Sequence, residues 1–204
     1  MAERKEKEKA RRSDDIVDGA ERLIFSRGYG NVSMDDIAKE LDLARSTLYL
    51  YYRNKEEIYA TIALRGGRIL TRMFDDCCAI GSDGLEKIKL MLLAFIDFSQ
   101  AYPGYHTAYC SARIPDSFSS EPGELARIHL AHTRIMVDAI HEGIVDGSLR
   151  KTIDPMKTSL TLLSSVSSTL VFSSMIEANL KDTSLTHEDL MDYSVAMLIH
   201  SIKK

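Results

Sequence analysis

Cysteine, proline and tryptophan are all scarce in this chain. Its 204 residues include three cysteines, four prolines and no tryptophan. The cysteines are Cys77, Cys78 and Cys110, and an odd number with two adjacent members does not make the disulfide framework of a small secreted domain. The few prolines, the eleven glycines and the lack of a long alternating pattern favour an all-α fold over a sheet protein.

Long apolar segments are also missing. The first twelve residues, MAERKEKEKARR, are charged and lack the apolar stretch of a secretory signal. The longest uncharged stretch, residues 158–176, contains ten Ser or Thr among its nineteen residues, which makes it a poor membrane-spanning candidate. We therefore expect a cytoplasmic protein.

No strong charge of one sign spreads over the chain, whose formal net charge is −4. Residues 1–65 carry 13 basic and 13 acidic residues, and residues 66–204 carry 13 and 17. The first twelve residues are the most basic segment, with six Lys or Arg against three Glu, a balance of +3. A nucleic-acid surface on this chain must therefore be local rather than a broad basic face.

Apolar spacing and capping residues predict a series of helices. Gly28 should end a first helix over residues 4–27, and Ser33 should cap a short second helix that ends near Leu41. Asn54, with Glu57 three positions later, should cap a fourth helix. The remaining helices are expected at about 45–52, 55–78, 83–102, 104–112, 122–146, 154–180 and 186–202, with a loop at 112–122.

The second and third helices are separated by only a tight turn, a spacing typical of a helix-turn-helix. An ordinary helical corner is the alternative. On the third helix, Leu48 and Tyr52 share a face that should be buried, together with Leu41 and Leu43 in the turn. The outward side carries groups that read base edges in a major groove, and flanking polar side chains suit phosphate oxygens. The outward residues are Arg45, Ser46, Tyr49 and Leu50, and the flanking ones are Thr47, Tyr51 and Lys55, with Ser33 added as a helix start that can hold a phosphate.

Residues 12–60 resemble the amino-terminal DNA-binding domain of the TetR family of transcriptional regulators, and the segment TLYLYYRNKEE at 47–57 carries the most specific part of the match. The other matching residues are Ile16, Gly19, Ala20, Leu23, Phe25, Gly28, Tyr29, Val32, Ser33, Asp36, Ile37, Ala38, Leu41 and Leu43. The turn departs from the family, which often has Gly in the turn and Ser or Thr as the cap. This chain has Asp42 and Ala44 there, and Asp42 could cap a slightly shifted helix.

The resemblance implies an all-helical homodimer whose third helix enters the major groove of a palindromic double-stranded DNA operator. It assigns base contacts to Arg45, Ser46, Tyr49 and Leu50, and phosphate contacts to Ser33, Thr47, Tyr51 and Lys55. It also implies a larger carboxy-terminal domain that binds a small molecule and releases DNA. We accordingly predict a helix-turn-helix DNA-binding domain with a basic arm at 1–55, and a helical effector-binding and dimerisation domain at 56–204.

The dimer is expected to form through the last two helices, where residues 158–176 mix apolar and small side chains and Val195, Leu198 and Ile202 supply an apolar side. Packing within one subunit is the alternative. An apolar or aromatic effector should bind among the central helices, although each candidate could equally be a core residue. These candidates are Met73, Phe95, Phe98, Tyr102, Tyr105, His106, Tyr109 and Met136.

The carboxy-terminal part shows no catalytic constellation, no cofactor motif and no metal site. His129 and His132 lie three residues apart, but two histidines do not make a closed metal site. We therefore expect a ligand-responsive transcriptional regulator, a repressor rather than an enzyme. A helical small-molecule enzyme and a non-specific DNA-architectural protein that retain a helix-turn-helix are the alternatives. The sequence leaves open the effector, the operator and its genes, repression against activation, and whether any cysteine is redox-active.

Overall fold

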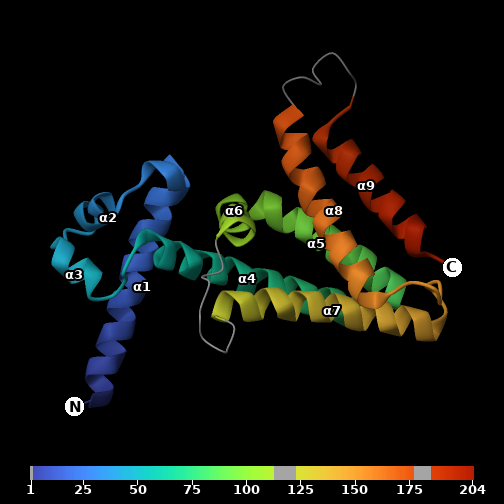
Figure 1. Cartoon of the computed structure of the whole chain (residues 1–204), viewed down its shortest axis with the longest axis horizontal. Coiled ribbons are helices and arrows are strands. Elements are labelled where there is room, and N and C mark those ends of the chain that lie inside the picture. Colours follow the sequence, from blue (N-terminus) through green and yellow to red (C-terminus); the bar gives the residue numbers. More distant parts are fainter. Residues whose placement is uncertain (1, 113–122, 177–184) are drawn as a thin grey trace. The chain divides into compact units, whose positions relative to one another are not determined.

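Helices and connecting turns make up residues 2–112, 123–176 and 185–204, which are the residues that the computed structural model describes (Figure 1). Within these ranges no β-strand is present beyond one isolated bridge, so the all-α fold is confirmed. Residues 113–122 of the loop predicted at 112–122, and residues 177–180 of the predicted long helix, lie outside the described residues. The elements are α1 (Ala2–Arg27), η1 (Tyr29–Asn31), α2 (Met34–Glu40), α3 (Arg45–Tyr49), α4 (Lys55–Ile80), α5 (Gly84–Ala101), α6 (Pro103–Ser111), α7 (Glu124–Asp146), α8 (Pro155–Ile176) and α9 (His187–Ile202).

The chain divides into two compact units. The first contains Met1–Gly67 and Gly104–Ala126, and the second contains Arg68–Pro103 and Arg127–Lys204. Helix α4 runs through both, so this division falls inside α4. The sequence-based boundary between residues 55 and 56 stays a prediction. Within the described ranges, no helix is long and apolar enough to cross a membrane.

The first unit is built around the second half of α1. A Cβ atom at Gly19 would lie 2.4 Å from Cδ2 of Leu41, so the missing side chain lets the end of α2 approach α1 closely. Arg65 of α4 pairs with Asp18 and Glu21 of α1 at 2.6 and 3.1 Å, which ties these two helices together. The buried apolar side chains of α1, α2 and α3 are Ile16, Val17, Ala20, Leu23, Ile24, Ile37, Ala38 and Leu48.

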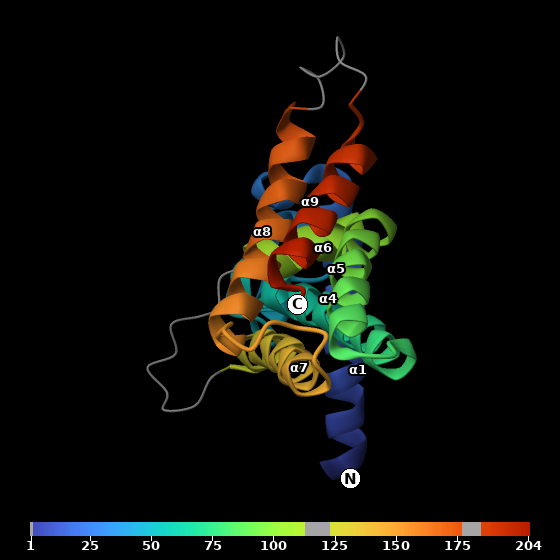
Figure 2. The ribbon, with the colours of Figure 1, turned by 90° about the vertical axis from the view of Figure 1, so that its right-hand side faces the viewer.

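Close helix contacts also organise the second unit. A Cβ atom at Gly84 would lie 2.2 Å from the backbone nitrogen of Gly143, so α5 meets α7 at a point where neither helix carries a side chain. Lys87 adds a salt bridge to Glu142 beside this contact. Helices α8 and α9 lie side by side in both views (Figures 1 and 2).

The apolar side predicted for the last helix points into its own subunit. Val195 and Ile202 are buried and Leu198 is half-buried, because α9 packs against α8 and α5. These three residues are therefore not the exposed apolar face that the sequence suggested. The large apolar side chains that α8 and α9 do expose are Met156, Leu160, Val171, Phe172, Met175, Tyr193 and Met197.

Candidate nucleic-acid interface

The turn between α2 and α3 closes with two hydrogen bonds that end α2. The N–H of Asp42 donates to the carbonyl of Lys39 at 3.2 Å, and the N–H of Leu43 donates to the carbonyl of Ala38 at 2.8 Å. This pattern is a Schellman motif, which requires a left-handed residue, and Asp42 has a φ of 51°. Asp42 therefore takes the place that the family often gives to Gly. It does not cap α3, whose N-cap is Ala44 without a side-chain hydrogen bond.

Ser33 and Asp36 form a reciprocal cap at the start of α2. The N–H of Asp36 donates to Oγ of Ser33 at 3.2 Å, and the N–H of Ser33 donates to Oδ2 of Asp36 at 2.8 Å. Hydrogen bonds from the side chain and backbone of Ser33 hold the pKa of Asp36 below its ordinary value. The Ser33 hydroxyl thus has a structural role, and the phosphate contact predicted for it remains a prediction.

Helix α3 separates its buried and exposed sides as the sequence predicts. Leu48 is fully buried and Tyr52 is 9% exposed. Tyr49 is 42% exposed and Leu50 is 76% exposed. Arg45 and Ser46 are exposed as well, whereas Thr47 and Tyr51 are half-buried. The regular helix ends at Tyr49 rather than at Tyr52, and Leu50 and Tyr51 follow in turn conformation.

Arg45 is held in place before any DNA is bound. Its Nε lies 3.0 Å from Oδ1 of Asp35 on α2, and its guanidinium carbon lies 5.7 Å from the centre of the Tyr49 ring. Sequence reasoning missed the role of Asp35. Ten positions separate it from Arg45, and only the folded turn brings the two together. The exposed face therefore presents an oriented cation beside an aromatic ring.

Lys55, predicted to contact a phosphate, is engaged within the first unit. Its ammonium donates to the carbonyls of Tyr29 and Val32, both at 2.7 Å, and lies 4.0 Å from the centre of the Tyr29 ring. These contacts fasten the start of α4 to the segment between α1 and α2. The geometry gives Lys55 a structural role, and its phosphate contact stays a prediction.

The residues predicted to line an effector site belong to both compact units. Met73, Phe95, Phe98, Tyr102 and Met136 lie in the second, and Tyr105, His106 and Tyr109 lie in the first. Phe95, Phe98, Tyr109 and Met136 are buried, Met73, Tyr105 and His106 are half-buried, and Tyr102 is exposed. Their joint role in effector binding therefore remains a prediction.

Tyr105 has a defined structural role in the first unit. Its hydroxyl donates to Oε1 of Glu21 at 2.8 Å, and its ring meets Phe25 edge to face. Burial and then the hydrogen bond to Glu21 raise the pKa of Tyr105 to about 12. At neutral pH this hydroxyl is a neutral donor to a carboxylate.

Two side chains that could take part in metal or redox chemistry, His132 and Cys77, are buried in the second unit. His132 is buried, lies 2.7 Å from Oγ1 of Thr71 and meets the Phe74 ring edge to face, all within the second unit. Burial raises the pKa of Cys77 to about 11, so its reactive thiolate form is rare at neutral pH. Among the described residues, no three His, Cys, Asp or Glu side chains gather closely enough to hold a metal ion.

A pocket of about 290 Å³ lies in the second unit and differs from the predicted effector site. Its lining includes four charged residues, among them the Lys87–Glu142 salt bridge, together with Cys78. None of the eight residues predicted to bind an effector lines it.

Comparisons with known proteins agree with this arrangement. A sequence model of the family described as "Bacterial regulatory proteins, tetR family" matches residues 16–62. The fatty acid metabolism regulator protein of Bacillus subtilis (strain 168) is 27% identical over 141 residues, which cover 68% of this chain and 71% of that protein.

Solved structures share the fold over most of the chain. The regulator FadR from Bacillus subtilis in complex with stearoyl-CoA gives a TM-score of 0.67 at 20% identity, covering 90% of this chain and 96% of that one. AibR in complex with isovaleryl coenzyme A and operator DNA gives a TM-score of 0.62 at 21% identity, covering 92% and 98%.

Proposed function

Because the chain belongs to the tetR family of bacterial regulatory proteins, we propose that it is a dimeric transcriptional repressor that an acyl-CoA, or a similar ligand with an apolar chain, releases from its operator. The observation that carries the DNA-binding part is the exposed side of α3. Arg45, Ser46, Tyr49 and Leu50 are all exposed there, on a helix whose opposite side is buried by Leu48.

The exposed face of α3 suits base reading in a major groove. Arg45 can donate in a bidentate manner to O6 and N7 of a guanine, and Leu50 can contact a thymine methyl group. Ser46 can donate to or accept from either kind of edge. Each well-placed pair contributes about 1–3 kcal/mol of discrimination against the wrong base.

A two-fold dimer would present two such faces to one duplex. Leu160, Val171 and Met175 are exposed at spacings of eleven and four residues on α8, which places them on one helical face. Ser164 and Ser168 lie on the same face and are also exposed. A stripe of apolar and small side chains lets a second copy approach closely, and the symmetry then sets two half-sites about 34 Å or a multiple of it apart.

The acyl-CoA part of the proposal rests on relatives. The Bacillus subtilis relative is a fatty acid metabolism regulator, and two structures with the same fold contain stearoyl-CoA and isovaleryl coenzyme A. An acyl chain is one ligand of the apolar or aromatic class that the sequence predicts. The predicted lining residues Phe95, Phe98 and Met136 are apolar and buried, which suits such a chain.

Release of DNA would then be a shift between two states of the dimer. The ligand must bind the DNA-free state more tightly than the DNA-bound state, and by reciprocity the operator must weaken ligand binding by the same factor. A coupling of about 1–3 kcal/mol, typical of such systems, changes operator affinity by about 5- to 150-fold.

Operator binding by two variants tests the DNA-binding part. Arg45→Ala and Tyr49→Ala should each lower the ratio of operator affinity to random-DNA affinity in fluorescence anisotropy titrations, while circular dichroism shows a folded protein. Arg127→Ala, an exposed arginine of the second unit, is the matched control and should bind as wild type does. Wild-type operator affinity in both α3 variants would refute the assignment.

Ligand titration into the protein–operator complex tests the effector part separately. Stearoyl-CoA and isovaleryl-CoA should release the operator, whereas coenzyme A without an acyl group should not. Operator binding that none of these ligands alters would overturn the acyl-CoA assignment and leave the DNA-binding assignment intact.

A further inference from the structure

The amino-terminal part of α1 stands clear of the first unit's core. Every residue from 4 to 12 is exposed, whereas Ile16 and Val17 are buried. The helix continues without interruption from Ala2 to Arg27, so its buried half fixes the direction of its exposed half. Ser13 adds a link at the junction, because its Oγ lies 2.8 Å from the hydroxyl oxygen of Tyr52.

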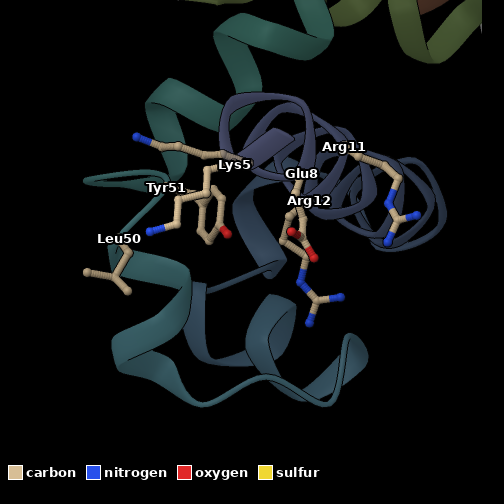
Figure 3. Close-up of a pocket in the computed structure, with 7 residues that line it drawn as sticks. Lys5, Glu8, Arg11, Arg12, Leu50 and Tyr51 are labelled. Atoms are coloured by element: carbon tan, nitrogen blue, oxygen red, sulfur yellow. The ribbon is translucent and has the colours of Figure 1, made fainter. Parts of the chain in front are cut away.

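This arm and the end of the recognition segment line an open pocket of about 640 Å³ (Figure 3). Figure 3 shows Lys5, Leu50 and Tyr51 close together at one side of this site, with Arg11 at the other side. The lining carries four cations and one carboxylate, a balance of +3. Its residues are Lys5, Glu8, Lys9, Arg11, Arg12, Leu50 and Tyr51.

The cations of the arm are available to a ligand. No ion pair recorded between described residues engages Lys5, Lys9, Arg11 or Arg12. Lys5, Lys9 and Arg12 are spaced four and three residues apart, which places them on one face of α1. At a rise of 1.5 Å per residue they extend over roughly 10 Å of helix, a row of positive charge next to Leu50 and Tyr51.

We propose that this arm is a second DNA contact, which binds the sugar-phosphate backbone of the operator beside the half-site that α3 reads. The inference rests on the proposed function and adds a partner for residues 4–12. Two features support a duplex as the occupant. The cations complement phosphate charge, and the row is continuous with Leu50 and Tyr51 at the end of α3.

The proposed contact is independent of base sequence. Phosphate contacts fix position and orientation on the duplex and carry no sequence information directly. The arm therefore raises affinity for operator and random DNA alike, and selectivity stays with α3. It also makes binding more sensitive to salt, by about 0.9 in the slope of log K against log salt for each phosphate contact.

The test is the triple variant Lys5→Gln, Lys9→Gln and Arg12→Gln. Glutamine keeps a helix-forming side chain of similar size, and the three positions are exposed, so the melting temperature should not change. Affinity for the operator at moderate salt should fall by about tenfold or more, and the salt slope should flatten by about 2 to 5 for the six cations lost from a dimer. The ratio of operator affinity to random-DNA affinity should stay within about twofold of wild type.

A charge-matched control separates the arm from net charge. Lys89→Gln, Lys151→Gln and Arg127→Gln remove the same charge from exposed positions of the second unit, and this variant should keep the wild-type salt slope. An arm variant with wild-type affinity and slope overturns the inference, as does an equal loss in both triple variants. If wild-type protein itself protects no discrete operator in a footprint, the proposed function fails instead.

Discussion

Asp35 and Arg45 show at the scale of single residues how the proposed DNA-reading face is arranged. The two side chains pair at 3.0 Å, and both are more than half exposed. An exposed ion pair contributes only about 0–1 kcal/mol, so its effect on folding is small. We expect the ion pair to affect DNA recognition more than folding, because it restricts the directions in which the guanidinium of Arg45 can donate hydrogen bonds.

Replacing Asp35 by Asn should therefore change selectivity more than stability. Without the carboxylate, Arg45 loses its orientation and the surface loses a negative charge. Binding to random DNA should strengthen, and the ratio of operator to random-DNA affinity should fall by up to about fivefold, the equivalent of 1 kcal/mol. Anisotropy titrations at fixed salt measure both affinities, and an unchanged ratio would contradict the role given to Asp35.

Lys55 illustrates a residue whose role only the fold reveals. Its position after Asn54 suggests a solvated or phosphate-binding cation. Its ammonium instead donates to the carbonyls of Tyr29 and Val32 and lies over the Tyr29 ring. The sequence carries no signal for this contact, since Tyr29 and Val32 lie more than twenty positions away.

Lys55→Met should consequently destabilise the first unit. Methionine retains an unbranched stem but leaves the two carbonyls without their charged donor, at a cost of about 1–3 kcal/mol in the free energy of unfolding. Urea denaturation measures this cost. Arg53→Met, whose exposed guanidinium lies 3.9 Å from Glu57, is the neighbouring control and should cost less than about 0.5 kcal/mol. Equal costs in the two variants would argue against the structural role of Lys55.

At the scale of elements, capping residues predict most helix starts. Ser33, Asp83 and Thr186 each accept a hydrogen bond from the N–H three residues later, as their types suggest. The start of α4 differs in detail. Asn54 accepts from the N–H of Glu57, but the Glu57 side chain accepts from the N–H of Arg53 and not from that of Asn54. The type of capping residue therefore predicts where a helix starts. The backbone conformation at that start decides which N–H group each side chain reaches.

Helix packing was less predictable from the sequence. Glycines allow close contact between helices that are far apart in the sequence, and nothing in the sequence says which helices meet. Helix α4 is continuous through Gly66. A Cβ atom at Gly66 would lie 3.0 Å from Cβ of Tyr105, so the glycine serves close approach to α6. Gly84 and Gly143 play the same part between α5 and α7.

Gly84→Ala should strain the contact between α5 and α7. The added methyl group would lie 2.2 Å from backbone of Gly143, which cannot rotate away as a side chain could. Overpacking of this kind costs about 1–3 kcal/mol, which lowers the melting temperature by several degrees in a chain of this size. Gly30→Ala is the control, since no atom lies within 4 Å of its added Cβ. A melting temperature equal to that of the control would show that the two helices separate freely.

For the whole molecule, the sequence predicted the fold class and the exposed side of α3 but not which side of α9 faces outward. Helices α8 and α5 both pack against α9, and Val195 and Ile202 are buried. Which side of α9 these neighbours cover is set by tertiary packing and is not visible in the spacing of apolar residues along α9. The prediction of a dimer therefore rests on the exposed face of α8 that contains Leu160, Val171 and Met175.

The double variant Val171→Glu and Met175→Glu should weaken the dimer. A carboxylate buried without a partner costs several kcal/mol, so the dissociation constant should rise by about a hundredfold or more. Sedimentation equilibrium measures it, and operator-specific binding should be lost in parallel. Val145→Glu, at an 87% exposed position on α7, is the control and should leave the dimer intact. An unchanged dissociation constant in the double variant would place the interface elsewhere.

Selection from a random duplex library tests the central claim most directly, because it requires neither a known operator nor a known ligand. Wild-type protein should enrich an inverted repeat whose half-site centres are about 10–10.5 base pairs or a multiple of that apart. Arg45→Ala should enrich the same spacing with one base per half-site no longer preferred. Enrichment of no inverted repeat by the wild-type protein, or full retention of every base preference by Arg45→Ala, would contradict the account.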